Sequence, residues 1–245
     1  MCKISIIVAT FNAEEYLFRA LHSVMNLDFH DWECIIQDGL SNDKTLEIAN
    51  YFSSIDGRFR IYSEKDAGIY DALNKAISKS KGDWIYILGA DDELIQDGLK
   101  YLLERSKDFD CVYGDVYIRD NNGKNVAFIS KDYHVLHTAM CCSHQAIIMR
   151  SSLIKKLGGF DLQFKISADF ELITRAFLSG AKFYQIHKFI CYFSSTGTSS
   201  SFKLSDLKEQ YNIFAKNKSC KFPALMVFVN FSKRFIRTYI YDPKR

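Results

Sequence analysis

The stretch WIYILGADDELI, residues 84–95, puts two adjacent carboxylates directly after an apolar run of strand length. Two comparable runs precede it, ISIIVAT at 4–10 and WECIIQD at 32–38, and segments with helical spacing of apolar residues lie between the three. Strands that alternate with helices indicate parallel strands joined by helical crossovers. The sequence therefore predicts an α/β fold with a mostly parallel central sheet flanked by helices.

The pattern changes after about residue 108. The segment CVYGDVYIRDNNGKNVAFI, residues 111–129, has two strand-like runs around an Asn-Asn-Gly turn, which predicts a hairpin. A helix at about 168–178, a strand near 181–190 and two further helices are expected to follow. In the first half, Asn12 and Ser41 stand where residues that cap the following helices would stand.

The composition excludes several classes of protein. Of 245 residues, 48% are hydrophobic and 25% are charged, and the net charge of +3 gives no general affinity for nucleic acid. The seven cysteines are scattered and form no C-x-x-C pair, which favours reduced thiols over a disulfide framework or a zinc site. The N-terminal sequence does not resemble a signal peptide and no apolar run is long enough to span a membrane. We therefore expect a cytoplasmic protein, at most peripheral on a membrane.

Polar residues follow the three predicted parallel strands. Thr10 and Asn12 follow the first, Asp38 ends the second, and Asp91 and Asp92 follow the third. Ligands of open α/β sheets bind at the carboxyl ends of the strands, so we expect these side chains to line one crevice. Two carboxylates there suit Mg²⁺ or Mn²⁺ that also binds substrate phosphates. The alternative is that Asp91 and Asp92 cap a following helix.

The segment DAGIYDALNKAI, residues 66–77, predicts a helix that Asp66 and Gly68 begin. Asn74 lies off the apolar stripe of this helix and is free to meet a ligand, although a turn and an amphipathic helix explain the rest of the segment. The predicted buried stripe consists of Ile69, Ala72, Leu73, Ala76 and Ile77.

The segment FKISADFELITRAF, residues 164–177, predicts a helix with Asp169 in its first turn. The helix dipole keeps a carboxylate ionised there, as a general base that accepts a proton at neutral pH requires. A carboxylate that only stabilises the helix start is the alternative. His144 and Gln145 precede an apolar run and are either structural or placed to bind acceptor hydroxyls.

Five blocks of the sequence strongly resemble family 2 glycosyltransferases with the GT-A fold. They are ISIIVATFNAEEYLFRALHSV, IIQDGLSNDKT, EKDAGIYDALNKAISKSKGDWIYILGADDEL, HQAIIMRSSLIKKLGGFD and ISADFELITR, in the expected order and spacing from residue 3 to about 190. Within the family they look like bacterial enzymes that extend lipid-linked O-antigen or exopolysaccharide units. The resemblance implies a GT-A catalytic domain at 1–200 and a C-terminal helical extension at 201–245. Its halves, 1–108 and 109–200, would bind the nucleotide-sugar and the acceptor.

The resemblance also implies chemistry, namely inverting transfer from a nucleotide-diphosphate sugar, most often a UDP-sugar, to a hydroxyl of an undecaprenyl-diphosphate-linked saccharide. Asp169 would be the catalytic base, and Asp91 and Asp92 would hold Mn²⁺ or Mg²⁺. The implied nucleotide-sugar ligands are Thr10, Asn12, Asp38, Asp66, Asn74 and Asp91, and the implied acceptor ligands are His144 and Gln145. Gly89 departs from the family, many of whose members have Asp or Asn there. A catalytically inactive protein that binds nucleotide-sugar or glycan is therefore the alternative function.

The C-terminal segment FPALMVFVNFSKRFIRTYIYDPKR, residues 222–245, lies outside the five blocks. A helix there would gather Asn230, Lys233, Arg234 and Arg237 in one sector, with large apolar residues around much of the remainder. Such a helix is too short to span a membrane but suits its surface, with the cations toward anionic lipid or a lipid diphosphate. A packed terminal helix or a homodimer contact is the alternative.

Overall fold

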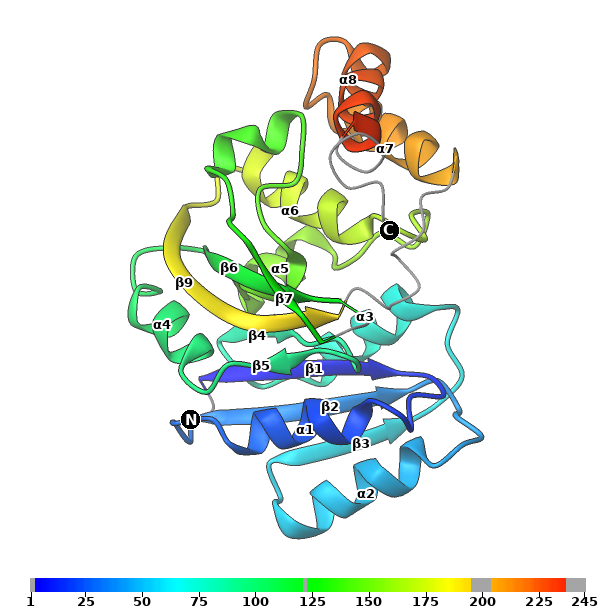
Figure 1. Ribbon diagram of the computed structural model, residues 1–245, viewed down its shortest axis with the longest axis vertical. Coiled ribbons are helices and arrows are strands. Elements are labelled where there is room, and N and C mark those ends of the chain that lie inside the picture. Colours follow the sequence, from blue (N-terminus) through cyan, green and yellow to red (C-terminus); the bar gives the residue numbers. More distant parts are fainter. Residues whose placement is uncertain (1–2, 121–122, 195–203, 237–245) are drawn as a thin grey trace.

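The computed structural model describes residues 3–120, 123–194 and 204–236. One mixed sheet runs through this part of the chain in the order β3-β2-β1-β4-β8-β6-β9-β5, with β7 paired to β6 (Figure 1). The strands are β1 Ile4–Thr10, β2 Trp32–Asp38, β3 Phe59–Ser63, β4 Trp84–Ile87, β5 Glu93–Leu94, β6 Cys111–Arg119, β7 Asn125–Phe128, β8 Ile147–Arg150 and β9 Phe183–Ser194.

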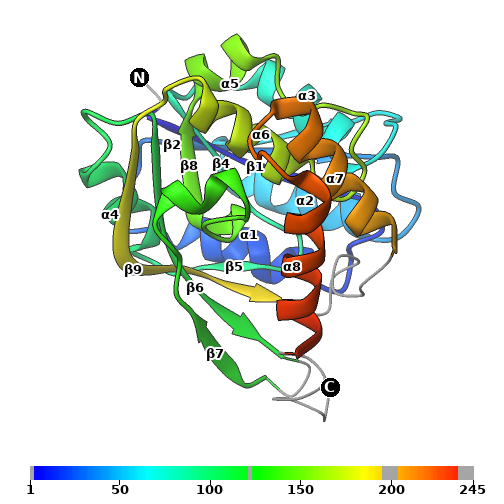
Figure 2. The ribbon, with the colours of Figure 1, turned by 90° about the horizontal axis from the view of Figure 1, so that it is seen from above.

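Helices cover both faces of the sheet (Figure 2). Helices α1, α2 and α4 pack on one face and α3, α5 and α6 on the other, with α7 against α6 and α8 against α7. The α-helices are α1 Leu17–Met25, α2 Thr45–Ile55, α3 Ile69–Lys79, α4 Gly98–Glu104, α5 Ser151–Leu157, α6 Ala168–Leu178, α7 Leu204–Asn217 and α8 Pro223–Ile236; the short 3₁₀ turns are η1 Tyr133–His137 and η2 His144–Ala146.

Alternate side chains of β1 pack into the hydrophobic cores on the two faces of the sheet. Ile6 and Val8 belong to the hydrophobic core on the α1 side, whereas Ile7 belongs to the core on the α3 side. Because both faces are covered, β1 and β2 are buried along nearly their whole length. This double burial explains why each strand is a continuous apolar run rather than an alternating one.

The sheet is parallel in its first half and mixed in its second. β1 pairs in parallel with β2 and β4, and β2 with β3. β8 runs antiparallel to both β4 and β6, while β6 is parallel to β9. The antiparallel pairing of β6 with β7 confirms the predicted hairpin, although residues 121–122 of its turn lie outside the described residues. Since β8 lies between β4 and β6, the two halves of the domain share one sheet.

Helix α6 confirms the helix predicted at about 168–178, and β9, α7 and α8 match the elements expected after it. The predicted caps are wrong, because α1 begins at Leu17 and α2 at Thr45, well beyond Asn12 and Ser41. The predicted stripe of α3 is wrong at one position. Ile69 is exposed at the helix start, whereas the four later members are buried.

Two expectations drawn from composition can be compared with the fold. The described cysteines are all free, and five of them, Cys34, Cys111, Cys141, Cys142 and Cys191, are buried. They serve as small apolar side chains in the core. Of the helices in the described ranges, none combines the length and the hydropathy needed to cross a bilayer.

Candidate active site

Asp38, at the carboxyl end of β2, is the buried centre of a hydrogen-bond network. Its Oδ1 accepts from Thr10 Oγ1 at 3.1 Å and from Ser41 Oγ at 2.5 Å. Its Oδ2 accepts from Ser41 N at 3.0 Å and from Ser63 Oγ at 2.8 Å. These bonds satisfy a carboxylate that has no access to water. The structure therefore brings Thr10 and Asp38 together, but both lie beneath the surface of the sheet edge.

The loops after β1 and β2 are fastened to each other. Asn12 N donates to Ser41 Oγ at 2.9 Å, and Asn12 Oδ1 accepts from Asn42 N at 3.0 Å. Asn12 has a φ of +49°, a left-handed conformation that asparagine adopts more readily than most residues. Its neighbour Phe11 is left with an exposed ring. The sequence analysis did not single out Phe11, although a large aromatic residue between two polar candidates was a usable signal.

Asp66 reaches the same edge from the loop before α3. Its Oδ1 accepts from Gly68 N at 2.9 Å. A Cβ at Gly39 would lie 2.5 Å from Asp66 Oδ2 and 3.5 Å from the ring of Phe11, so a larger residue at position 39 would displace the carboxyl of Asp66. Asp66, Phe11 and the backbone after β2 therefore form one continuous surface.

Asn74 does not face this surface. Its Nδ2 donates to the carbonyl of Phe160 at 2.8 Å, and its Oδ1 accepts from Phe160 N at 2.8 Å. A Cβ at Gly159 would lie 2.5 Å from the same Oδ1. The expectation of a free amide is therefore wrong. Helical spacing correctly put Asn74 off the buried stripe of α3, but the turn before α6 occupies that side of the helix.

Asp91 and Asp92 do not cap a helix, because β5 follows them directly and α4 begins only at Gly98. Asp91 is half-buried, and burial raises the pKa of its carboxyl. Asp92 is 1% exposed; its Oδ1 accepts from Ser194 N at 2.8 Å, and its Oδ2 has no hydrogen-bond partner among the described residues. Burial, and then the charge of Asp91, raise the pKa of Asp92 to about 7.

Gly89 makes this pair of carboxylates possible. A Cβ at residue 89 would lie 2.3 Å from Asp92 Oδ2 and 3.0 Å from Asp91 Oδ1. No side chain tolerates a contact as short as the first, so an Asp or Asn at this position would displace the carboxyl of Asp92. The carboxyl of Asp92 therefore occupies the space that a side chain of residue 89 would take, and both carboxylates converge beside Gly89.

His144 and Asp169, 25 positions apart in the sequence, form an ion pair with Nδ1 3.1 Å from Oδ2. Their side chains are 35% and 21% exposed. Burial alone would lower the pKa of His144, but the contact and charge of Asp169, then the charges of Asp92 and Asp91, raise it overall. Burial alone would raise the pKa of Asp169, but His144 and the backbone N–H groups at the start of α6 lower it overall.

These four side chains form one charged cluster, in which the carboxylates of Asp91, Asp92 and Asp169 all act on His144. Gln145 is adjacent in sequence but buried, and its Oε1 accepts from Ser143 Oγ at 2.5 Å, so it is not placed to meet an acceptor hydroxyl. Within the described ranges, no three His, Cys, Asp or Glu side chains are arranged to hold a metal by themselves. A cation here would need oxygen ligands from a substrate or water as well.

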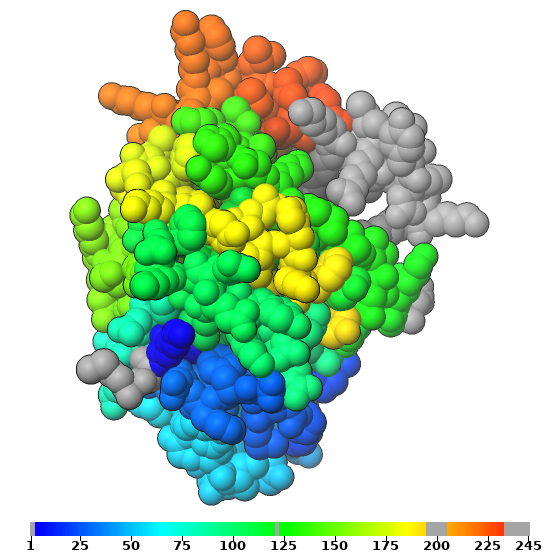
Figure 3. Space-filling model, turned by 90° about the vertical axis from the view of Figure 1, so that its left-hand side faces the viewer, coloured from blue at the N-terminus to red at the C-terminus, as the bar shows by residue number. Residues whose placement is uncertain are grey.

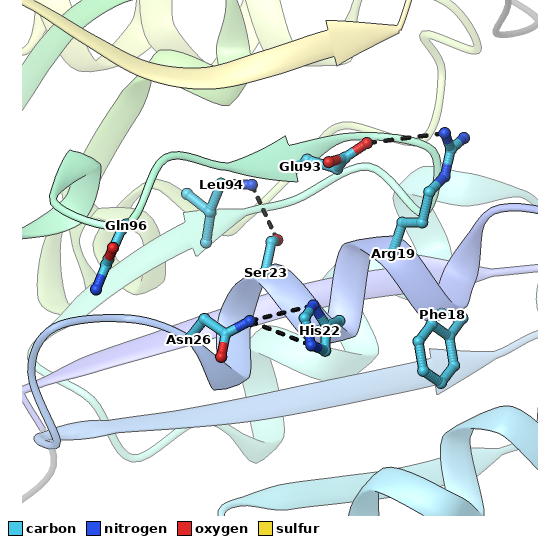
Figure 4. A pocket seen from close by; sticks show the side chains of 8 residues that line it. All are labelled: Phe18, Arg19, His22, Ser23, Asn26, Glu93, Leu94 and Gln96. Atoms are coloured by element: carbon cyan, nitrogen blue, oxygen red, sulfur yellow. Dashed lines mark hydrogen bonds and ion pairs between the residues drawn. The ribbon is translucent and has the colours of Figure 1, made fainter.

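A separate pocket of about 280 Å³ lies between α1 and β5 (Figure 4). Arg19 points from α1 toward Glu93, Ser23 Oγ accepts from Leu94 N at 2.9 Å, and Asn26 lies against His22 (Figure 4). None of the predicted site residues lines this pocket, and its polar groups pair with one another. The charged cluster of Asp91, Asp92, His144 and Asp169, rather than this pocket, is therefore the candidate active site.

Comparison with known families gives the cluster its context. The sequence model of "Glycosyl transferase family 2" matches residues 5–158, which is more than half of the chain. The chain belongs to glycosyl transferase family 2. The matched region of this glycosyltransferase runs from β1 through α5 and so includes Asp38, Gly89, Asp91, Asp92 and His144. Asp169 lies just beyond it.

Relatives of this glycosyltransferase are known in bacteria. A PGL/p-HBAD biosynthesis glycosyltransferase of Mycobacterium bovis (strain BCG / Pasteur 1173P2) is 34% identical over 182 residues, which are 72% of this chain and 70% of the relative. A putative teichuronic acid biosynthesis glycosyltransferase of Bacillus subtilis (strain 168) is 32% identical over 111 residues, 45% of this chain and 44% of that protein.

A solved structure shows the same fold. S. aureus TarS 1–349 in complex with UDP-GlcNAc superposes with a TM-score of 0.74 at 19% identity, over 99% of this chain and 76% of that one. This glycosyltransferase therefore has the GT-A fold, as the motifs predicted, with helices α7 and α8 at the C-terminal end of the described chain.

Proposed function

We propose that this glycosyltransferase transfers a hexose from a UDP-sugar to a hydroxyl of an undecaprenyl-diphosphate-linked saccharide, with inversion, in bacterial surface polysaccharide synthesis. The convergence of Asp91, Asp92, His144 and Asp169 in one cluster is the observation that carries the proposal. The names of the two relatives support a surface glycan as the product. The UDP-GlcNAc complex of TarS supports a UDP-sugar as the donor.

The exposed ring of Phe11, with Asn12 and Asp66 beside it, supports a nucleoside site at the ends of β1 and β2. An aromatic face stacks on a nucleobase, and neighbouring polar groups hydrogen-bond the ribose. Thr10 and Asp38 are occupied with each other and with Ser41, so they would contribute by holding these loops in position. Donor binding would thus belong to residues 1–108, and acceptor binding to residues 109–200.

Asp91 and Asp92 fit Mn²⁺ or Mg²⁺, because their carboxylates converge beside Gly89 and the second oxygen of Asp92 lacks a partner among the described residues. Two carboxylates, substrate phosphates and water form the usual oxygen shell of such ions. A cation bound there would stabilise the charge that develops on the leaving diphosphate.

Asp169 would accept the proton of the acceptor hydroxyl. Its lowered pKa keeps it ionised at neutral pH, and its place in the first turn of α6 fixes its orientation. The ion pair with His144 would hold the Asp169 carboxylate in place, and His144 is also within reach of the charges of Asp91 and Asp92. An acceptor aligned by these groups would attack the anomeric carbon opposite the diphosphate, and a single displacement of this kind inverts its configuration.

The test is release of UDP from a panel of UDP-sugars in the presence of lipid-linked acceptors, with and without added Mn²⁺ or Mg²⁺. Wild-type turnover that needs the metal and is lost in Asp169→Asn supports the proposal, and Asp108→Asn, at an exposed carboxylate, is the matched control. A wild-type protein that is stabilised thermally by UDP but turns over no donor would instead be the inactive binder that the glycine at residue 89 motivates.

A further inference from the structure

Helix α8 packs Met226, Val227 and Asn230 toward the domain and leaves other large apolar side chains exposed. Val227 is buried, and Asn230 Nδ2 donates to the carbonyl of Thr138 at 2.7 Å. The expectation that Asn230 belongs to a cationic sector facing a membrane is therefore wrong. The side chains of the other members of that sector, Lys233, Arg234 and Arg237, lie outside the described residues.

The outward side of α8 is apolar. Phe222, just before the helix, is 61% exposed, Leu225 is 58% exposed and Phe228 is 66% exposed. Residues spaced by three along a helix lie within a sector of about 120°. These three large side chains, which we call the α8 apolar face, therefore point in one general direction and gain nothing from the fold by being there.

Cations lie just before this face in the chain. Lys218 and Lys221 are exposed in the turn between α7 and α8. Residues 216–245 contain eight Lys or Arg residues and one Asp, whereas the net charge of the entire chain is only +3. The remaining residues are therefore net acidic. A basic C-terminal sequence after an otherwise acidic one is the charge asymmetry expected of a protein that meets an anionic surface with that segment.

Helix α8, which carries the α8 apolar face, lies at one end of the molecule (Figure 1). Helices α7 and α8 form the end of the molecule opposite α2 (Figure 1). In the space-filling view, α7 and the start of α8, coloured orange, project beyond the rest of the molecule at this end (Figure 3). A flat partner could therefore contact this end without touching β1, β2 or β3.

We propose that the α8 apolar face inserts into the headgroup region of a bilayer containing anionic lipid, with Lys218 and Lys221 at its rim. Three side chains offer far less than the roughly 800 Å² per partner that a stable protein interface buries, which disfavours a second copy of the chain. A few apolar anchors with adjacent cations are sufficient for reversible binding to lipid. The inference rests on the proposed function in one respect, since docking would bring the enzyme to a lipid-linked acceptor.

The test is co-sedimentation of the full chain with phosphatidylcholine vesicles, with and without phosphatidylglycerol. We expect binding only when phosphatidylglycerol is present, and weaker binding at high salt because screening removes the electrostatic part. Replacing the face by Phe222→Ser, Leu225→Ser and Phe228→Ser should reduce binding by roughly tenfold or more. The matched control is Tyr51→Ser, Ile55→Ser and Leu178→Ser, which removes three exposed apolar side chains elsewhere and should bind as wild type does.

Two further measurements keep the outcomes separate. UDP-induced thermal stabilisation should be equal in the wild type and the α8 triple variant, because the change is remote from the charged cluster. Wild-type protein that ignores phosphatidylglycerol but binds UDP overturns docking and leaves the proposed function intact. Vesicle binding without UDP binding supports docking and contradicts the proposed function. A wild-type dimer that becomes monomeric in the triple variant would assign the face to a second copy and overturn the proposal.

Discussion

Two groups of acidic residues at the edge of this sheet differ in how well the protein satisfies them. Asp38, at the end of β2, accepts four hydrogen bonds from Thr10, Ser41 and Ser63. Asp92, which follows β4, accepts one from Ser194 and keeps an oxygen without a partner in the described part of the chain. Both are buried, so the difference is in their partners and not in their exposure.

The number of hydrogen-bond partners separates residues that serve the fold from residues that serve a ligand. A buried carboxylate with all its hydrogen bonds made contributes to stability and to a fixed loop geometry. A buried carboxylate that lacks a partner lowers stability, and a protein keeps such a group where function needs it. We therefore expect changes at Asp38 to act on unfolding, and changes in the Asp91, Asp92, His144 and Asp169 cluster to act on ligand binding and turnover.

The largest effect is expected from Asp169→Asn. Loss of a general base lowers the turnover rate by about 10³-fold, while the isosteric amide keeps the start of α6 in place. Steady-state UDP release and a thermal melt of the same preparation measure the two quantities. Loss of activity together with a large drop in melting temperature would show that Asp169, like Asp38, serves the fold, and would contradict its assignment as a catalytic base.

Asp38→Ala comes next, with an expected loss of about 3 kcal/mol in the free energy of unfolding. The change leaves three hydroxyls and one backbone N–H without their acceptor. Urea unfolding measures it, and Asp38→Asn, which retains one acceptor oxygen, should lose less. An alanine variant as stable as wild type that has lost UDP binding would show that Asp38 acts on the ligand directly.

Gly89→Ala should reduce stability by about 2 kcal/mol and weaken the binding of Mn²⁺ in the presence of UDP. The new Cβ would overlap Asp92 Oδ2, and relieving that contact moves the carboxyl away from Asp91. Isothermal titration with MnCl₂ and a thermal melt provide the two readings. Gly57→Ala is the control, because a Cβ there meets nothing within 4 Å. Equal Mn²⁺ affinity in the two variants would contradict a role for the paired carboxylates.

The last prediction is opposite in sign to the others, a gain of stability in Asp92→Asn at high pH. The folded-state pKa of Asp92 is raised from 3.8 to about 7, so its contribution is complete below pH 3.8 and is lost as the pH rises toward 7. The asparagine variant should match wild type near pH 4 and be more stable than wild type at pH 8, where only the wild type has a buried charge at residue 92. Urea unfolding at the two pH values would falsify the assignment of Asp92 as an unsatisfied group if the difference were absent.

The strands that are buried on both faces could be predicted from the sequence, because such strands consist largely of apolar residues. The runs at 4–10, 32–38 and 84–87 are visible because helices cover both faces of β1, β2 and β4. β3 was missed because only Phe59 of its five residues is fully buried, so Phe59–Ser63 shows neither a continuous nor a clear alternating pattern. The curvature of the second half, with β8 inserted between β4 and β6, depends on pairings between distant segments.

The site shows the same limit more sharply. Residue types and strand ends offered Asp91, Asp92 and Asp169 as candidates, with stabilisation of a helix start as the alternative for each, and only the resemblance to the family gave them catalytic and metal-binding roles. Spacing could not show that His144 pairs with Asp169, because that contact exists only once η2 and α6 are packed together. Spacing also predicted Asn12 and Ser41 as helix caps, whereas the side chain of each accepts a hydrogen bond from a backbone N–H of the other loop.

The shared sheet has a consequence for engineering. β8 pairs with β4 from one half and β6 from the other, and Asn74 on α3 grips both backbone groups of Phe160 across 86 positions of sequence. Chimeras that join residues 1–108 of one relative to residues 109–200 of another must therefore take β4, β8, Asn74 and Phe160 from a single parent. Dividing the chain near residue 108 would separate β4 from β8 and β5 from β9, and so expose an edge of each strand that the sheet now covers.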